Sequence, residues 1–432
     1  MNEKLLLGIA REDITPEIGC QLFGYFPDVY SESINDNLYV TAFAFTYGDT
    51  RVIFESVNIC SINNEIQHKI REEISAKLDI PFDNIILAAT HTHSGPNAAG
   101  MVGWGDMDED YTIGCFKTAL VKAAVDAASN QQEVLVATAV GNSNVGINRR
   151  QLTAKNGVTL GQNPWGPFDP KMTVISFKNL QGEVLGNIIA YGCHGTSAGV
   201  NHEITRDWSG IMTDALETVS GGITAFFNGA EGDVGPRLSN GGTTGNITLT
   251  KELGAIAARD ALQIYNSITE YKEVSVSVYA NPIKLPLLPR IPLEEAERNF
   301  ALYKGKSLTN IDKKRADYFE QVIASYADDF KEEEYREIPQ TILRIGEVAF
   351  VTSPYELFSE INMRIDRMVD DLNVIVLSNT NGIGGYFPTQ DQICRGGYEV
   401  LSFLYDAVQC YTEDADYQLI KEIYKNIQNL KR

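Results

Sequence analysis

The stretch that decides the fold is "RVIFESVNICSINNEIQHKIREEISAKLDIPFDNIILAATHTHSGP", residues 51–96. Two runs rich in apolar and β-branched residues, at 51–59 and 83–90, are typical of strands. Between them, residues 61–78 favour a helix that Ser61 is placed to cap. One helical stripe of apolar residues recurs at every fourth position: Ile62, Ile66, Ile70, Ile74 and Leu78. The order strand–helix–strand predicts a parallel pair with a right-handed crossover, and therefore an α/β fold.

The same pattern of an apolar run followed by a polar loop recurs four times further along the chain. The runs are 184–192, 222–227, 347–353 and 373–378. Ligands of open α/β sheets bind beyond the carboxyl ends of the strands. Together with the HTHSGP loop, these loops predict one shared site. We expect a mixed, mostly parallel central sheet with helices on both faces.

Residues 290–337 have a different composition, charged and helix-favouring, with no strand-like run. Charge runs of this kind are usually solvated faces. We expect a helical excursion from the sheet rather than an independent domain, so that residues 1–432 form a single catalytic domain.

The chain carries 36 Lys and Arg against 57 Asp and Glu, a net charge of −21. This balance argues against nucleic acid or an anionic membrane as the main partner, since both are bound by basic patches. The six cysteines are scattered without a CxxC pair, which excludes a disulfide scaffold and a cysteine-type zinc site. The N-terminal apolar run is too short for a signal peptide, and no run has the length of a membrane span. We expect a cytoplasmic protein.

Two of the five histidines, His91 and His93, stand one residue apart just after a strand. In an extended segment such residues point to the same side. Imidazole is the commonest zinc ligand, but a hydrogen-bonded scaffold role is the alternative. His194 repeats the setting at another strand end, which strengthens the case for a metal. His68 and His202 lack that setting, and we expect structural or surface roles for both.

The pattern alone does not assign a role to three other polar residues. Glu356 is expected at the start of a helix, where an acidic residue in the first turn offsets the helix dipole. Tyr386 can equally be a packed loop aromatic. Asp233 is either a turn residue or a carboxylate that supports a metal ligand. The apolar residues at 101–104 are suited to an acyl pocket or to core packing.

A set of motifs spread over most of the chain resembles the catalytic region of the neutral/alkaline ceramidases, which are zinc-dependent amidases that split ceramide into sphingosine and fatty acid. The motifs occur in order: "DITP" (13–16), "GY" (24–25), "THTHSGP" (90–96), "NRR" (148–150), "CHGTS" (193–197), "GDVGP" (232–236), "PYE" (354–356) and "GYFPT…GGYE" (385–399). THTHSGP is the most distinctive of them, and the ordered set is stronger than any one member.

The resemblance implies that Zn²⁺ is bound by His91, His194, Glu356 and Tyr386. Two neutral imidazoles, a carboxylate and a phenol deprotonated by the metal form a chemically reasonable set. The fifth position is left for water, whose pKa near 7 on zinc suits it to attack an amide carbonyl.

The resemblance also implies the catalytic residues. His93 is expected to be an acid/base group or a contact to the substrate carbonyl. Tyr398 is expected to donate to the substrate oxygen. Either Arg149 or Arg150 is expected to stabilise the oxyanion, and the sequence does not decide between them.

The chain departs from the family pattern at Gly235, where the usual GDVSP loop carries a serine implicated as a nucleophile. Glycine cannot be acylated, so direct attack by zinc-bound water is expected. The immunoglobulin-like C-terminal domain of ceramidases is expected to be absent, because an amphipathic helix closes the chain.

The sequence therefore predicts a zinc-dependent hydrolase of an amide C–N bond, acting on N-acylsphingosine or a related small or lipid-like N-acyl compound. One alternative is a zinc esterase or amidase with a non-sphingolipid substrate. The other is a non-catalytic zinc-binding or ligand-binding homologue that has lost the family serine.

Overall fold

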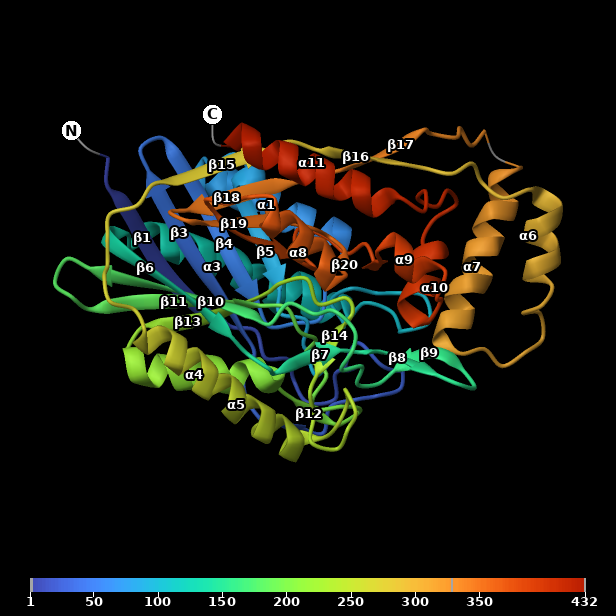
Figure 1. Cartoon of the computed structure of the whole chain (residues 1–432), viewed down its shortest axis with the longest axis horizontal. Coiled ribbons are helices and arrows are strands. Elements are labelled where there is room, and N and C mark those ends of the chain that lie inside the picture. The colour runs from blue at the N-terminus through green and yellow to red at the C-terminus, as the bar shows by residue number, and fades with distance from the viewer. Residues whose placement is uncertain (1–2, 328, 431–432) are drawn as a thin grey trace.

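The computed structural model describes residues 3–327 and 329–430. Two β-sheets pack face to face, and helices cover the outer face of each sheet (Figure 1). The result is a four-layer α/β/β/α arrangement. The prediction of a mixed α/β fold is confirmed.

The larger sheet has eight strands and the smaller has four. In spatial order the larger sheet contains β13 (Ile223–Asn228), β11 (Val184–Tyr191), β10 (Lys171–Asn179), β6 (Gln132–Asn142), β1 (Leu5–Asp13), β3 (Tyr39–Tyr47), β4 (Thr50–Val57) and β5 (Ile85–Ala89). The smaller sheet contains β15 (Val276–Ala280), β18 (Thr341–Ile345), β19 (Val348–Thr352) and β21 (Asn373–Leu377).

Alternate residues of one strand face different layers, as β4 illustrates. Phe54 lies in the core between the two sheets, where its ring centroid is 5.1 Å from that of Phe350 on β19. Its neighbour Ile53 points the other way and packs under the outer helices. Both faces of this strand are therefore buried, which explains why three apolar residues, 52–54, stand in succession rather than alternating with polar ones.

Six helices form the two outer layers. On the larger sheet, α1 (Asn64–Leu78) and α3 (Lys117–Ser129) cover one half, and α4 (Asp207–Ser220) and α5 (Ile247–Asn266) cover the other. On the smaller sheet lie α8 (Ser359–Arg367) and α11 (Ala415–Leu430).

Two parts of the predicted architecture are wrong. The sheets are mainly antiparallel, and only the pairs β4/β5, β11/β13 and β19/β21 are parallel. The reason is that two-residue connections at 48–49 and 346–347 join β3 to β4 and β18 to β19, and so short a link permits only a hairpin. Helices cover only one face of each sheet, because the other face packs against the second sheet.

Each of the three parallel pairs contains a crossover helix, in the units β4–α1–β5, β11–α4–β13 and β19–α8–β21. The carboxyl ends of these units are joined by backbone hydrogen bonds. Ala89 N donates to Asn379 O at 3.2 Å, and Ser378 N donates to Asn228 O at 3.2 Å. The loops that follow the parallel strands therefore meet at one place.

Helix α1 shows how local sequence fixes one of these units. Its N-cap is Asn63 rather than the predicted Ser61, and the Asn63 side chain accepts from the backbone N–H groups of Glu65 and Ile66. The predicted isoleucine stripe is buried against the sheet, with Ile66, Ile70 and Ile74 inside.

Short strand pairs lie around the carboxyl ends of the parallel strands. They are β2 (Ser33–Ile34) with β12 (Glu203–Ile204), β7 (Gly146–Asn148) with β14 (Val234–Pro236), β8 (Arg150–Thr153) with β9 (Gly157–Leu160), and β20 (Glu356–Leu357) with β22 (Tyr386–Phe387). Three short helices complete this region: α2 (Glu109–Tyr111), α9 (Gln390–Ile393) and α10 (Tyr398–Leu404).

The helical excursion is confirmed. Helices α6 (Leu293–Phe300) and α7 (Asn310–Ser325) stand at one end of the molecule, beside α10 (Figure 1). They share a small apolar cluster that includes Ala296, Phe319 and Val322. The excursion lies between β16 (Ile283–Pro286) and β17 (Tyr335–Ile338), which pair with each other.

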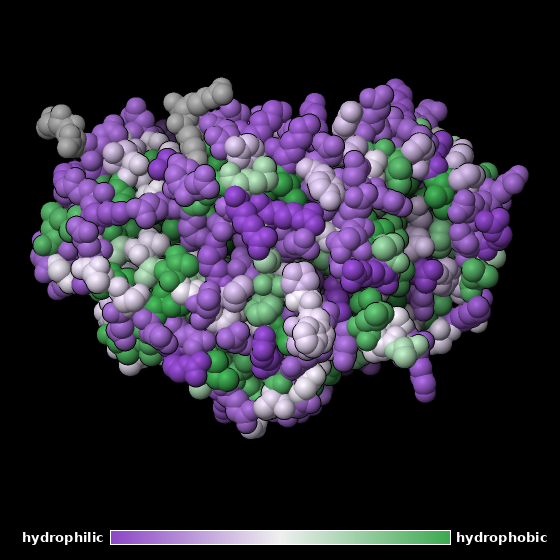
Figure 2. Space-filling model, in the orientation of Figure 1, coloured by the Kyte–Doolittle hydropathy of each residue, from purple (hydrophilic) through white to green (hydrophobic). Residues whose placement is uncertain are grey.

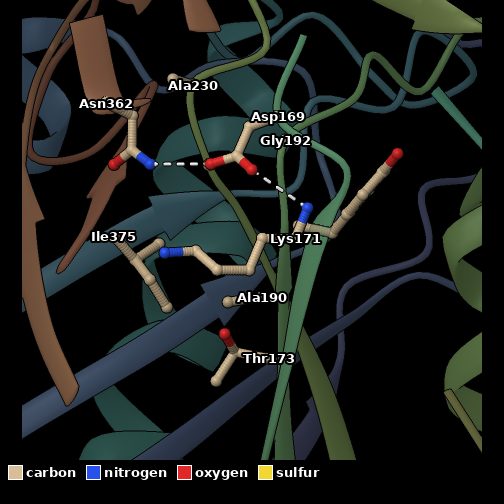
Figure 3. A pocket seen from close by; sticks show the side chains of 10 residues that line it. Asp169, Lys171, Thr173, Ala190, Gly192, Ala230, Asn362 and Ile375 are labelled. Atoms are coloured by element: carbon tan, nitrogen blue, oxygen red, sulfur yellow. Dashed lines mark hydrogen bonds between the residues drawn. The ribbon is translucent and has the colours of Figure 1, made fainter. Parts of the chain in front are cut away.

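A polar seam lies where β10 of the larger sheet meets α8 (Figure 3). Asn362 Nδ2 donates to Asp169 Oδ2 at 3.1 Å, and Lys171 Nζ lies 2.7 Å from Asp366 Oδ2. The cavity here has a volume of about 20 Å³, which is room for about one water molecule. It is a packing feature rather than a ligand site.

Hydrophilic residues dominate the face of the molecule in Figure 2, and the hydrophobic residues on it form small separate groups. Across residues 3–327 and 329–430, no helix combines the length and apolar character that crossing a bilayer requires.

Candidate active site

The two histidines of the HTHSGP loop converge, although the loop is not extended as expected. His91 has φ of 65°, in the left-handed region that a residue with a side chain rarely adopts. A hydrogen bond from His91 N to Ile59 O, at 2.9 Å, holds this conformation. The two Nε2 atoms of His91 and His93 lie 3.3 Å apart. Backbone strain of this kind is concentrated at functional sites.

The four predicted metal ligands lie together and are buried. Glu356 Oε2 is 3.0 Å from His194 Nε2 and 3.4 Å from His91 Nε2. Tyr386 Oη is 3.3 Å from His194 Nε2. Glu356 lies in β20 rather than in a first helical turn, and the pairing of β20 with β22 sets it directly beside Tyr386.

The protonation of this cluster fits a bound cation. His91 Nδ1 is 2.9 Å from Cys60 O and His194 Nδ1 is 2.9 Å from Glu231 O. Because a carbonyl oxygen can only accept, each Nδ1 carries the proton and each Nε2 presents a lone pair. Both lone pairs face Glu356 Oε2, a buried oxygen without a hydrogen-bond donor in the described chain. Burial lowers the pKa of His91, but Cys60 and Glu356 outweigh it and hold that pKa well above 6.5, so a positive charge, as a proton or as a metal ion, is stabilised among these three atoms.

Electrostatics within the cluster keep Glu356 ionised and His194 neutral. Burial raises the pKa of Glu356, but the rings of His91 and His194 outweigh it and hold that pKa well below its usual range. Burial and the nearby Arg149 guanidinium lower the pKa of His194 to about 3. A carboxylate and a neutral imidazole are the forms that bind zinc.

Arg149 faces this cluster and Arg150 does not, so Arg149 is the arginine of the pair that lies at the site. Arg149 Nη2 donates to Tyr386 Oη at 3.0 Å. Burial raises the pKa of Tyr386 well above 10, and the Arg149 charge opposes that rise. Arg150 instead donates to Gly396 O and Gln392 Oε1, away from the histidines.

A single buried carboxylate, Glu399 at the start of α10, pairs with both arginines. Glu399 Oε1 accepts from Arg149 Nε at 2.9 Å, and Oε2 accepts from Arg150 Nη1 at 2.7 Å. Charge-assisted bonds in a buried setting fix side-chain geometry strongly. Arg150 therefore acts on the site only through the carboxylate that it shares with Arg149.

The GY loop packs tightly on His93. Gly24 has φ of 126°, and a Cβ there would lie 2.3 Å from His93 Nδ1. The Tyr25 ring meets the His93 ring edge-on with centroids 5.0 Å apart. Burial lowers the pKa of His93 well below 6.5, and neighbouring His91 adds to the effect. His93 is thus held as a neutral base beside the cluster.

A cavity of about 310 Å³ opens beside the cluster. His93, Arg149, Tyr386 and Tyr398 line its inner part, and Tyr398 stands edge-on to Tyr386 with centroids 5.5 Å apart. Trp104 also lines it. Of the predicted apolar stretch 101–104, therefore, the tryptophan belongs to the cavity, whereas Val102 is exposed.

The remaining residues singled out in the sequence lie outside the cluster. The side chains of His68 and His202 are exposed, as predicted. Asp233 is a buried support: its carboxylate accepts from Ser359 N at 2.7 Å and from Asn148 Nδ2 at 3.1 Å. Gly235 is buried in β14, with Thr243 against it.

Two residues near the cluster escaped the sequence reasoning. Asn379 has φ of 48°, and its Nδ2 donates to Glu231 Oε1 at 2.8 Å and lies 3.2 Å from His91 Nδ1. Burial raises the pKa of Glu231 to about 8. Both follow parallel strands, in loops that the sequence flagged, but nothing in their spacing distinguishes them from ordinary turn residues.

Comparison with known families agrees with this geometry. The sequence model described as neutral/alkaline non-lysosomal ceramidase, N-terminal, matches residues 5–249. The chain belongs to this family. Among ceramidases, the neutral ceramidase of Pseudomonas aeruginosa is 23% identical over 464 residues, covering 92% of this chain and 69% of that protein. Neutral ceramidase A of Dictyostelium discoideum is 28% identical over 257 residues, or 53% of this chain and 35% of that protein.

Solved ceramidase structures share the fold. The crystal structure of neutral ceramidase from Pseudomonas aeruginosa aligns with a TM-score of 0.73 at 20% identity, over 98% of this chain and 74% of that one. A ceramidase complexed with C2 aligns with a TM-score of 0.72 at 19% identity, over 99% of this chain and 76% of that one. The fold assignment therefore rests on nearly the whole chain.

Proposed function

We propose that this ceramidase-family chain is a zinc-dependent amidase that hydrolyses the C–N bond of an N-acyl compound. The observation that carries the proposal is the close approach of three buried ligand atoms, Glu356 Oε2 and the Nε2 atoms of His91 and His194. Nitrogen and oxygen ligands at one point suit zinc. Family membership and the names of the ceramidase relatives support the reaction type.

The ligands would be His91, His194, Glu356 and Tyr386. When bound, a zinc ion there would supply Lewis-acid polarisation of the amide carbonyl and activation of a water molecule. The protein contributes the fixed orientation of both rings, through the bonds from each Nδ1 to a backbone carbonyl.

The other side chains handle protons and charge. Neutral His93, at the cavity wall, is placed to accept a proton from the attacking water. The Arg149 guanidinium, held by Glu399, offers positive charge beside the carbonyl oxygen, and the Tyr398 hydroxyl is a second donor. One donor of this kind lowers a barrier by roughly 3 kcal/mol. We propose water as the nucleophile, since Gly235 carries no hydroxyl.

Metal analysis of His194→Ala tests the proposal, with His68→Ala as the matched control because His68 is exposed on α1. Wild type and the control should contain about one zinc per chain and cleave N-acyl substrates. His194→Ala should lose both properties but stay folded in urea titrations. Zinc occupancy and turnover equal to wild type in His194→Ala would disprove the ligand set.

A substrate panel separates the proposal from its alternatives. It contains N-acylsphingosines, N-acyl amines and p-nitrophenyl esters. Faster cleavage of short esters than of every amide would make the chain an esterase. Full zinc occupancy without hydrolysis of any member would make it a non-catalytic homologue.

A further inference from the structure

One buried hydroxyl in the wall of the cavity beside the cluster has no partner in the protein. Other hydroxyls of the described lining already make hydrogen bonds to protein groups, namely those of Tyr25, Thr196, Thr309 and Tyr386. Thr243 also lines the cavity and is 6% exposed, but its Oγ1 has no hydrogen-bond partner in the part of the chain that the structure describes. Buried polar groups normally have a partner, so the contents of the cavity must supply one, as water or as substrate.

The side chain of Thr243 occupies the space beside Gly235, and this packing sets its orientation. A Cβ built at Gly235 would lie 2.8 Å from Thr243 Cβ and 2.9 Å from Thr243 Cγ2. The methyl group therefore packs against β14, which leaves the hydroxyl for the cavity. The same point is 3.3 Å from Arg149 Cβ, so Thr243 and Arg149 are neighbours in the inner wall.

The loop that carries Thr243 joins β14 to α5 and is held on both sides of this residue. Gln162 Nε2 donates to Leu238 O at 2.8 Å and to Gly242 O at 2.9 Å. Thr243 O accepts from Thr196 Oγ1 at 3.0 Å. Because its backbone is fixed in this way, Thr243 can recognise one defined position of a bound substrate.

The hydrogen-bonding groups of an amide show what Thr243 could contact. An amide has a carbonyl oxygen that accepts and an N–H that donates. Arg149 and the Tyr398 hydroxyl are the donors proposed for the carbonyl oxygen, and burial raises the pKa of Tyr398, which keeps it protonated. His93 is the proposed acceptor for the proton of the water. The substrate N–H is then left without an acceptor, which costs free energy in a buried site, and Thr243 Oγ1 can accept it.

We propose that Thr243 Oγ1 accepts a hydrogen bond from the N–H of the scissile amide, and that Thr243 thereby selects amides over esters of the same shape. This inference rests on the proposed amidase function and names a residue that sets the specificity of that same site. An ester has an oxygen where the amide has its N–H, so it cannot donate this hydrogen bond.

Two substrates that differ only in this group test the proposal: N-octanoylethanolamine and ethylene glycol monooctanoate. Thr243→Val keeps the shape of the side chain and removes the hydroxyl. The kcat/KM for the amide should fall roughly 3- to 10-fold, because the N–H loses its acceptor, whereas that for the ester should change less than about twofold. Equal losses on both substrates, or no loss on the amide, would overturn the proposal.

Two further variants separate the role of the hydroxyl from that of packing. Thr243→Ser keeps Oγ1 but loses the methyl group that packs against Gly235, so its amide-to-ester ratio of kcat/KM should stay near the wild-type value even where urea titration shows lower stability. Thr218→Val, on an exposed position of α4, is the control and should leave both rates unchanged. A ratio for Thr243→Ser that equals the ratio for Thr243→Val would refute a role for the hydroxyl.

Binding of the same two compounds, measured by calorimetry, separates this inference from the proposed function. If neither compound is cleaved, the amidase proposal fails, but the wild type should still bind the amide more tightly than the ester, and Thr243→Val should remove that preference. An ester that binds without being cleaved is compared through its inhibition constant. Cleavage of the amide with the same preference in wild type and Thr243→Val would leave the amidase proposal standing and refute the role of Thr243.

Discussion

Replacing Gly235 by serine is expected to destabilise the protein rather than restore a nucleophile. A Cβ at this position would lie 2.8 Å from Thr243 Cβ and 3.3 Å from Arg149 Cβ, and the first of these distances is shorter than real contacts allow. Overpacking of a buried site costs about 1–3 kcal/mol. The loop cannot simply give way, because Thr243 O accepts from Thr196 Oγ1 at 3.0 Å.

Activity should fall as well, because the strain reaches Arg149. A shift of about 1 Å in a group that positions the reacting atoms can lower the rate about 100-fold. We therefore expect Gly235→Ser to reduce kcat/KM by roughly 10- to 100-fold on any amide that the wild type cleaves.

Urea unfolding and kcat/KM measurements on four variants test whether a side chain at position 235 destabilises the protein and lowers its activity. Gly235→Ala and Gly235→Ser should lose similar stability, because the clash comes from Cβ. Gly235→Ser with Thr243→Gly should recover most of it. Gly114→Ser is the control, since its added Cβ meets nothing within 4 Å. A Gly235→Ser enzyme with wild-type stability and higher activity, or an acyl adduct on that serine in a mass spectrum, would refute this reasoning.

Three further predictions concern the surroundings of the site. Glu399→Gln removes the negative charge that pairs with two buried arginines. Urea titration should therefore show a free energy of unfolding lower by about 3–5 kcal/mol. Steady-state kinetics should show a fall in kcat that is larger than the change in KM. Gly24→Ala places a methyl group against His93, so kcat should fall while the zinc content measured by elemental analysis stays at the wild-type level. Burial raises the pKa of Asp233 from 3.8 to about 6, so the folded state binds its proton more tightly. The tighter proton binding contributes about 3 kcal/mol to the free energy of unfolding below pH 4, and this contribution is lost as the pH rises through about 6. Urea titrations between pH 4 and about 6 measure how the free energy of unfolding changes with pH. Asp233→Asn should remove the part of that change due to Asp233, and an unchanged pH dependence would contradict the assignment.

The parts of the fold that the sequence predicts are those formed by local signals. The crossover at 51–90 is visible because its helix has a clear isoleucine stripe and its strands are rich in apolar residues. The sequence does not reveal that most strand pairs are antiparallel, because these strands are buried on both faces and so have the apolar composition typical of parallel strands. The two-residue turns at 48–49 and 346–347, each containing a glycine with positive φ, are the sequence signal that favours hairpins.

Site residues were predicted where a motif identifies them, and missed where only the three-dimensional arrangement does. His91 and His194 stand in distinctive sequences after strands. The orientation of Arg149 towards the site depends on Glu399, which is 250 positions away. No pattern within a short window of sequence contains such information.

The three crossover units have a consequence for how the molecule reaches its native state. The four proposed ligands follow strands from all three units and span positions 91 to 386, so they meet only after both sheets have formed and packed together. Contacts of such high sequence separation slow folding, because loop-closure entropy is lost before they form. An ion that binds all four ligands has little affinity for intermediates with only one or two units assembled. Binding of such an ion would therefore increase the free-energy difference between the native state and partly assembled forms.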